Sequence, residues 1–202
     1  MYLLNLQFVN YTIMKLNLPL YFTILLISFS NLVHAVNKTW TNGNNTGLWN
    51  DAANWSPTGV PSSADDVQFD ATSSDNCFIS TGGTVQVAAF TINSGYGGIV
   101  SQNAGTPLEM GDFVQAGGSF VGSSSAVNSS ILIEGTFTKT GGTYTATNGK
   151  TTIGKDFGGN VTLFLHAAGT FIHGGGEIEF NSGHSLSNYH MTINADGLIF
   201  ND

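Results

Sequence analysis

The sequence has no arginine and few charged residues of any kind. Its 202 residues include 5 lysines and 13 acidic residues, which gives a formal net charge of -8 at pH 7. Proteins neutralise the phosphates of nucleic acids with a basic surface, so this composition excludes a nucleic-acid partner. The excess of acidic residues instead favours solubility, or weak binding of divalent cations.

Cysteine and helical periodicity are also scarce. Cys77 is the only cysteine, which excludes an internal disulfide framework and a cysteine-based zinc site. We expect it to be a small buried apolar residue. After residue 35 no stretch has a helical repeat of apolar residues, whereas 26 glycines and many Thr, Ser and Asn residues indicate turn-rich β structure.

One apolar run lies near the N-terminus. Lys15 precedes residues 18–29 (LPLYFTILLISF), and Val33 and Ala35 supply the small residues of a cleavage motif. We predict that residues 1–35 hold a secretory signal peptide, that translation starts at Met14, and that the mature protein is secreted or displayed at the cell surface. The run is shorter than the roughly 20 residues that span a bilayer, so we expect no stable membrane span after cleavage.

An eight-residue pattern occurs four times in the mature chain. It consists of an aromatic residue, three variable residues, a Gly-Gly or Ala-Gly pair, a hydroxyl residue and an apolar residue. The copies are residues 78–85 (FISTGGTV), 113–120 (FVQAGGSF), 137–144 (FTKTGGTY) and 164–171 (FLHAAGTF). Their starts lie 35, 24 and 27 residues apart, which is the spacing of a solenoid or a hairpin array.

Two folds fit these repeats. Residues 136–147 (TFTKTGGTYTAT) match a β-hairpin whose Gly pair forms the turn. In a right-handed parallel β-helix, the same Gly pair would form a corner between two faces of one coil. Because spacings in the twenties suit one coil per repeat, we predict an all-β, right-handed parallel β-helix over residues 77–202, with the antiparallel hairpin array as the alternative.

Apolar and polar residues alternate with a period of two within the repeats. Ile131, Ile133 and Phe137 share one parity, which predicts one buried and one solvated face. Lys139 falls on the buried parity beside Gly141. We expect the chain to turn its ammonium group out to solvent at this corner.

Three tryptophans open the mature chain. Trp40, Trp49 and Trp55 lie within sixteen residues among Asn, Gly and Pro turns. We interpret residues 36–76 as a module whose indoles cap the end of the solenoid core. The other interpretation is a carbohydrate platform, in which exposed faces of the same three rings stack on sugars.

This module resembles the opening unit of autotransporter-associated β-strand repeat proteins and of other large secreted bacterial surface proteins. The matching residues are Trp40, Gly47, Trp49, Asn54, Trp55, Pro61, Asp66, Val67 and Phe69. The order of the later strand segments extends the resemblance over residues 39–202. It implies a glycine-rich, adhesin-like β-solenoid outside the cell. The chain ends in LIFND without a capping segment, so we expect it to be part of a longer protein.

No group of residues has the spacing of a metal site. The candidate ligands are four histidines of the last coils and four aspartates near the module. They are His166, His173, His184, His190, Asp65, Asp66, Asp70 and Asp75. The histidines lack the short spacing of zinc ligands, and the aspartates lack the pattern of a calcium loop. We therefore expect no metal and no cofactor.

A catalytic site is not expected either. Glu177 and Glu179 point to one face of a predicted strand, and paired carboxylates can serve glycoside hydrolysis. A β-helix lyase would normally need Arg or clustered Lys beside its carboxylates, and the chain offers neither. We expect a protein that is not an enzyme and has no catalytic residues.

Three functional classes remain. The first is a non-catalytic structural or adhesive segment of a secreted or cell-surface protein. The second is a carbohydrate-binding or carbohydrate-active β-helix, with cell-surface or extracellular glycans as partners. The third is ice binding through a threonine-rich face, suggested by Thr136, Thr138, Thr140, Thr143, Thr145 and Thr147. It is disfavoured because this ladder does not recur in the other copies.

Overall fold

The computed structural model describes residues 35–154, 162–180, 190–193 and 198–199. The predicted signal peptide, residues 1–35, lies outside this range except for its last residue. Residues 35–202 form one compact unit of the chain. Within the described ranges, no helix has the length and apolar character needed to cross a membrane.

The described residues form strands and one short 3-10 helix. The first elements are β1 (Asn37–Trp40), η1 (Ala52–Asn54), β2 (Trp55–Ser56), β3 (Asp66–Phe69), β4 (Cys77–Ile79), β5 (Val85–Ile92), β6 (Ile99–Gln102), β7 (Leu108–Gln115) and β8 (Ser119–Val121). The later elements are β9 (Ile131–Ile133), β10 (Phe137–Lys139), β11 (Thr143–Thr145), β12 (Thr151–Ile153), β13 (Thr162–His166), β14 (Thr170–Ile172), β15 (Ile178–Phe180), β16 (His190–Ile193) and β17 (Leu198–Ile199).

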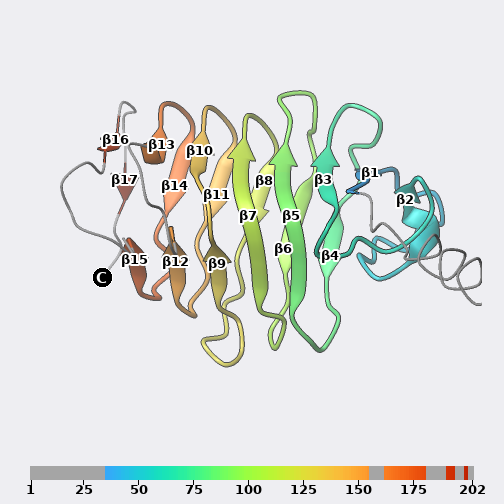
Figure 1. Ribbon diagram of the computed structural model, residues 1–202, viewed down its shortest axis with the longest axis horizontal. Coiled ribbons are helices and arrows are strands. Elements are labelled where there is room, and N and C mark those ends of the chain that lie inside the picture. Colours follow the sequence, from blue (N-terminus) through green and yellow to red (C-terminus); the bar gives the residue numbers. More distant parts are fainter. Residues whose placement is uncertain (1–34, 155–161, 181–189, 194–197, 200–202) are drawn as a thin grey trace, which may run out of the picture. The chain divides into compact units, whose positions relative to one another are not determined.

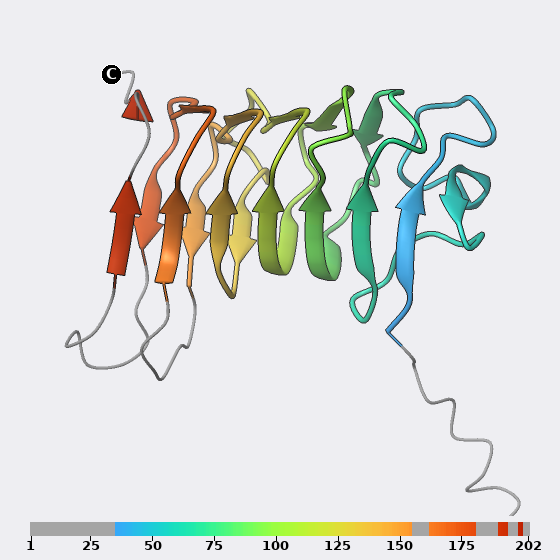
Figure 2. The same ribbon diagram turned by 90° about the horizontal axis from the view of Figure 1, so that it is seen from above.

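These strands form two sheets of stacked coils. In sheet A the order is β15-β12-β9-β7-β5-β3-β1-β2, with β10, β13 and β16 continuing from the second half of β7. Sheet B has the order β17-β14-β11-β8-β6-β4. Successive coils follow one another along the stack, with the two sheets facing each other (Figures 1 and 2).

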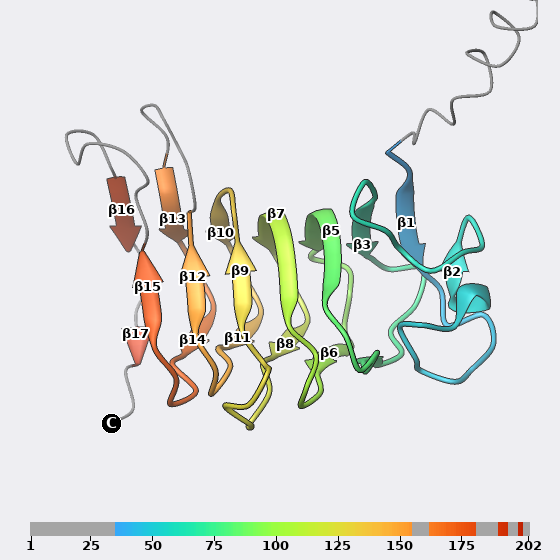
Figure 3. The ribbon, with the colours of Figure 1, turned by 60° about the horizontal axis from the view of Figure 1, so that its bottom comes forward.

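Among the strands that the structure describes, every pairing is parallel except the one between β1 and β2. The predicted parallel β-helix is thus confirmed, and the hairpin array is wrong. The strands on either side of the Gly pair, β10 and β11, belong to different sheets and pair with other coils instead of with each other (Figure 3). Gly142 forms this corner with a φ of 65°, and a Cβ there would collide with the carbonyls of Gly117 and Gly118.

The first of the four predicted repeat copies is not a structural repeat. Phe113, Phe137 and Phe164 lie in register in sheet A, and the residue that precedes them in this column is Phe90. Phe78 lies in sheet B, opposite Ser101, with its side chain on the outer face. The true series has intervals of 23, 24 and 27 residues, which removes the anomalous first spacing of 35.

A stacked column of aromatic rings fills the core between the sheets. From Trp49 the rings continue through Phe90, Phe113, Phe137 and Phe164, with centroid separations of 6.0, 5.8, 5.1 and 4.8 Å. A second column on the sheet B side meets the first edge-on. Its rings are those of Phe120, Tyr144 and Phe171. Each coil therefore buries its aromatic residues against those of the next coil, as the repeat pattern predicts.

The Trp-rich module shares this core with the coils. β1 and β3 extend the parallel sheet A, and the antiparallel β2 covers the edge of β1. Residues 36–76 therefore pack as the first part of the same stack, and β2 pairs with the Thr39 and Trp40 positions of the outer edge of β1.

Cys77 is fully buried in β4, and burial raises the pKa of its thiol well above the ordinary value. We expect the native chain to resist labelling by a thiol reagent at mildly alkaline pH, because the reactive thiolate is both inaccessible and disfavoured. The same chain in concentrated guanidinium should be labelled completely. Rapid labelling of the native chain, followed by mass spectrometry, would contradict the placement of β4.

Candidate functional site

The three tryptophans considered as a sugar platform are part of the core. Trp40, Trp49 and Trp55 are 0%, 1% and 2% exposed. Trp55 packs edge-on against both Trp40 and Trp49, with ring centroids 5.1 and 4.8 Å apart. Stacking on a sugar needs an exposed ring face, so these three buried residues provide no sugar platform.

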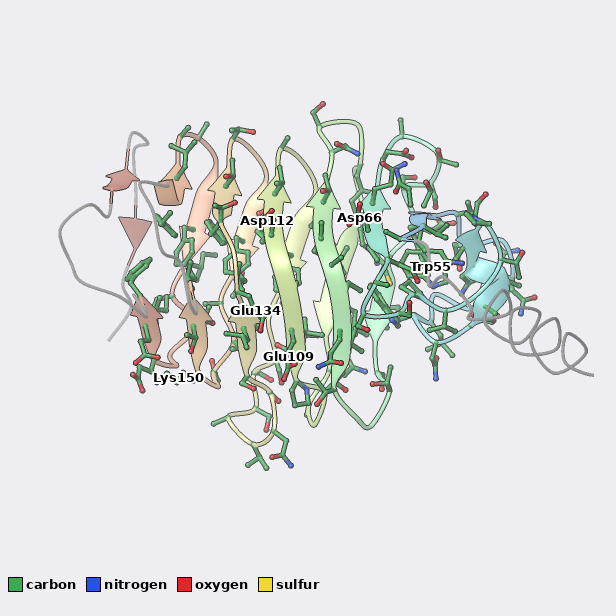
Figure 4. All side chains as sticks on the ribbon, in the orientation of Figure 1. Trp55, Asp66, Glu109, Asp112, Glu134 and Lys150 are labelled. Carbon is green, nitrogen blue, oxygen red and sulfur yellow. The ribbon has the colours of Figure 1, made fainter. Side chains whose placement is uncertain are left out.

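Buried hydrogen bonds fix the indoles and the loop around them. Trp40 Nε1 donates to the carbonyl of Asp75 at 3.0 Å, and Trp55 Nε1 donates to the carbonyl of Trp49 at 2.8 Å. The amide of Asn54 donates to Thr46 Oγ1 and accepts from the backbone of Asn44. These contacts give a structural role to Trp40, Trp55 and Asn54 in the motif that carries the family resemblance. Figure 4 shows Trp55 within this module.

The aspartates of the predicted acidic group make separate structural contacts. The carboxylate of Asp65 accepts hydrogen bonds from the backbone of Val36 and from Ser62. Burial raises the pKa of Asp65, but these hydrogen bonds outweigh it and hold the pKa below the ordinary value. Asp70 accepts from the backbone of Thr72, and Asp75 accepts from Asn42.

The remaining candidate ligands do not converge either. Among the residues that the structure describes, no three His, Cys, Asp or Glu side chains are grouped as a metal would require. Glu177 and Glu179 both contact Lys150, at 3.4 and 2.9 Å. His184 lies outside the described residues, and His190 lies in β16.

A buried polar column runs beside the Gly corners. Gln115, Lys139 and His166 occupy the same register position in three successive coils, two residues after the aromatic residue. All three are buried. The amide of Gln115 donates to the carbonyls of Gly117 and Thr143 at 3.1 and 2.9 Å. The column therefore supplies side-chain hydrogen bonds to carbonyls at and beside the corners.

The predicted exposure of Lys139 is wrong. Its side chain is fully buried, and Nζ donates to the carbonyls of Gly141, Gly142 and Ala168 at 2.5, 2.6 and 3.2 Å. These carbonyls converge inside the corner and satisfy all three donors of an ammonium group, so the side chain has no need to reach solvent. Burial lowers the pKa of Lys139 to about 8, which leaves the ammonium form dominant at neutral pH.

His166 extends the column toward the last coils. Its Nε2 lies 3.1 Å from the carbonyl of Gly169, so Nε2 carries the proton. Nδ1 is buried and accepts no hydrogen bond from the described residues. Burial, together with the charge of Lys139, lowers the pKa of His166 although the Gly169 hydrogen bond opposes the shift. The imidazole is thus held neutral, which suits a structural role.

A shallow cavity of about 250 Å³ lies at the edge of the Trp-rich module. It is lined by Trp49, residues 60–63, Thr81 and residues 84–86. Hydroxyl groups and one amide supply its polar surface, and none of these residues is charged. Its volume is below the roughly 300–1,000 Å³ of most small-molecule sites, so it does not define a substrate pocket.

Charge is segregated between the two sheets. Asp66, Glu109, Asp112 and Lys150 lie on or beside the outer side of sheet A (Figure 4). In contrast, the strands β4, β6, β8, β11, β14 and β17 contain no charged residue. On β4, β6, β8, β11 and β14, whose side chains the structure describes, the outward-facing side chains are thus hydroxyl or apolar.

We call this surface the uncharged face. It consists of Leu48, Phe78, Ile99, Ser101, Ser119, Val121, Thr143, Thr145, Thr170 and Ile172. Sequence reasoning missed Phe78 because its eight-residue match assigned the ring to the core. The signal that could have revealed it is parity, since Cys77 and Ile79 flank Phe78 and are both buried.

No family model, curated protein or solved structure matches the chain.

Proposed function

We propose that the chain is a non-catalytic structural or adhesive segment of a secreted or cell-surface protein. The aromatic column from Trp49 to Phe164 is the observation that carries this proposal. It commits the interior of each coil to contacts with its neighbours. Rigid parallel ladders reinforce these contacts along the stack, and such an array serves well as a stiff, protease-resistant spacer.

The polar contacts of the described residues support the same function. Gln115, Lys139 and His166 are occupied by corner carbonyls, and Lys150 pairs with two glutamates. These polar groups therefore contact other parts of the same chain and stabilise its fold. The resemblance to autotransporter-associated repeat proteins and the predicted signal peptide support a location outside the cell.

Protease resistance and polysaccharide turnover test this function. We expect the full chain to withstand proteinase K at concentrations that degrade a Phe137→Ala variant, because opening of the aromatic column exposes backbone to cleavage. We also expect no release of reducing ends or unsaturated uronates from neutral or acidic polysaccharides. Turnover that Glu177→Gln or Glu179→Gln abolishes would instead show an enzyme, and equal digestion of both chains would contradict a stiff spacer.

A further inference from the structure

The uncharged face carries an aromatic platform at one end. Leu48, Phe78 and Ile99 are 41%, 42% and 41% exposed. Leu48 and Phe78 are bridge partners in parallel orientation, so their side chains lie on the same side of the sheet. In a protein with net charge -8, such a group of exposed apolar side chains marks a surface for contact with a partner.

The Phe78 ring is held in place from behind. Gly47 has a φ of 67°, and a Cβ at this position would lie 3.2 and 3.3 Å from two carbons of the ring. The ring therefore rests on the bare backbone of Gly47. The Phe78 N–H donates to the carbonyl of Gly47 at 2.7 Å, and the Phe78 carbonyl accepts from Trp49 at 3.0 Å. Gly47 thus supports one side of the Phe78 ring, and the other side of the ring is open to solvent.

Two columns of outward-facing residues continue the face along the stack. Ile99, Ser119, Thr143 and Thr170 are register partners in successive coils. The second column, in line with Phe78, has Ser101, Val121, Thr145 and Ile172. Neighbouring coils lie about 4.8 Å apart. The hydroxyls of the first column therefore recur at short, regular steps, whereas the second column alternates hydroxyl and apolar residues. The alignment differs from the threonine ladder considered from sequence, because it joins one residue from each coil.

We propose that the uncharged face binds a linear neutral polysaccharide that lies along the stack. Phe78 stacks on the apolar side of one sugar ring, and the serine and threonine hydroxyls exchange hydrogen bonds with sugar hydroxyls. This proposal deepens the adhesive part of the proposed function and rests on it. It assigns the sugar-stacking role to Phe78, in place of the three buried tryptophans.

The charge of the protein and the extent of its exposed apolar surface favour a neutral polysaccharide over an acidic polymer or a second copy of the chain. Acidic polymers would be repelled by the net charge of the chain and would find no cation in sheet B to pair with. A second copy of the chain would need about 800 Å² of well-packed, largely apolar contact on each partner. The strongly exposed apolar side chains gather at one end of the uncharged face. Along the rest, five hydroxyl residues outnumber the apolar Val121 and Ile172, which suits a polymer rich in hydroxyls.

Affinity electrophoresis of the full chain tests the proposal. The probes are hydroxyethylcellulose, mixed-linkage β-glucan and galactomannan, with polygalacturonate as the charged comparison. We expect at least one neutral polymer to retard the chain, and Phe78→Ala to weaken that binding at least tenfold. Phe78→Trp should retain it, and Thr143→Val, which removes one hydroxyl at nearly constant size, should weaken it several-fold. Val127→Ala is the matched control, since Val127 is exposed on a loop outside the face.

Several results would overturn the proposal. These are the absence of retardation by all three neutral polymers, unchanged binding by Phe78→Ala with a native circular dichroism spectrum, or preference for polygalacturonate. Sedimentation that shows a dimer broken by Phe78→Ala would assign the face to a second copy, and thermal hysteresis lost in Thr143→Val would assign it to ice. Failure to bind leaves the protease and turnover assays unaffected, so failure of this proposal is distinguishable from failure of the proposed function.

Discussion

Replacing Phe137 with alanine should lower the free energy of unfolding by about 4 kcal/mol, whereas the same change at Phe78 should lower it by about 1 kcal/mol or less. Both residues open a copy of the same sequence pattern, but only Phe137 is buried. Its ring stacks between Phe113 and Phe164 at 5.1 and 4.8 Å and meets Tyr144 edge-on at 5.0 Å. Alanine would leave a cavity in the middle of the column.

Urea denaturation of the two variants and the parent chain measures this difference. Each free energy should come from the midpoint and slope of the same transition, because a change in slope would indicate that the stack no longer unfolds as one unit. Equal losses at Phe78 and Phe137 would contradict the register of sheet B and would restore residues 78–85 as a true repeat.

Lys139→Ala should also be strongly destabilising, by about 3 kcal/mol, whereas Lys139→Gln should cost about 1 kcal/mol or less. Alanine removes the ammonium donor from the carbonyls of Gly141, Gly142 and Ala168, and it removes the side chain that fills the corner. Of these carbonyls, that of Gly142 keeps a hydrogen bond from the backbone of Thr170. Glutamine is the matched control because Gln115, at the same register position one coil earlier, donates to the carbonyl of Gly117, which corresponds to Gly141. If Lys139→Ala is as stable as the parent chain, water must reach the carbonyls at this corner.

The pH dependence of stability gives an independent measurement of the buried ammonium group. Burial lowers the pKa of Lys139 from 10.5 to about 8. Between these values the unfolded chain binds more protons at this residue than the folded chain, so the Lys139 contribution to stability rises with pH. Below about pH 8 both states are protonated and the contribution is level. The difference in unfolding free energy between the parent and Lys139→Gln should follow this rise, and a flat difference would contradict burial.

Parity and spacing predicted the fold class, but they did not predict which sheet or face holds particular side chains. The intervals after Phe113 gave one coil per repeat, and the Gly pairs gave corners. Phe78 was misassigned because a match of eight letters carries no information about which sheet holds the segment. Phe90 aligns with Phe113 in the structure. It was not recognised as a repeat position because the segment that begins with it does not match the eight-residue pattern.

The candidate site was harder to predict for a related reason. The parity of Lys139 was correct, yet one of its three acceptors comes from Ala168, 29 residues further along the chain. Only the stacking of coils brings that carbonyl to the ammonium group. The uncharged face likewise depends on alignment between coils, since Ser119, Thr143 and Thr170 are adjacent only after the register is known.

The passage of one aromatic column from Trp49 into Phe90 and onward has a consequence for assembly. In an array where coils contact only their nearest neighbours, each interface supplies part of the free energy that a single coil lacks. The rings of the tryptophan module pack against one another and against Phe90, so we expect the module to give the first coil a surface on which to order. We then expect later coils to add in chain order, each one ordered against the ring stack before it.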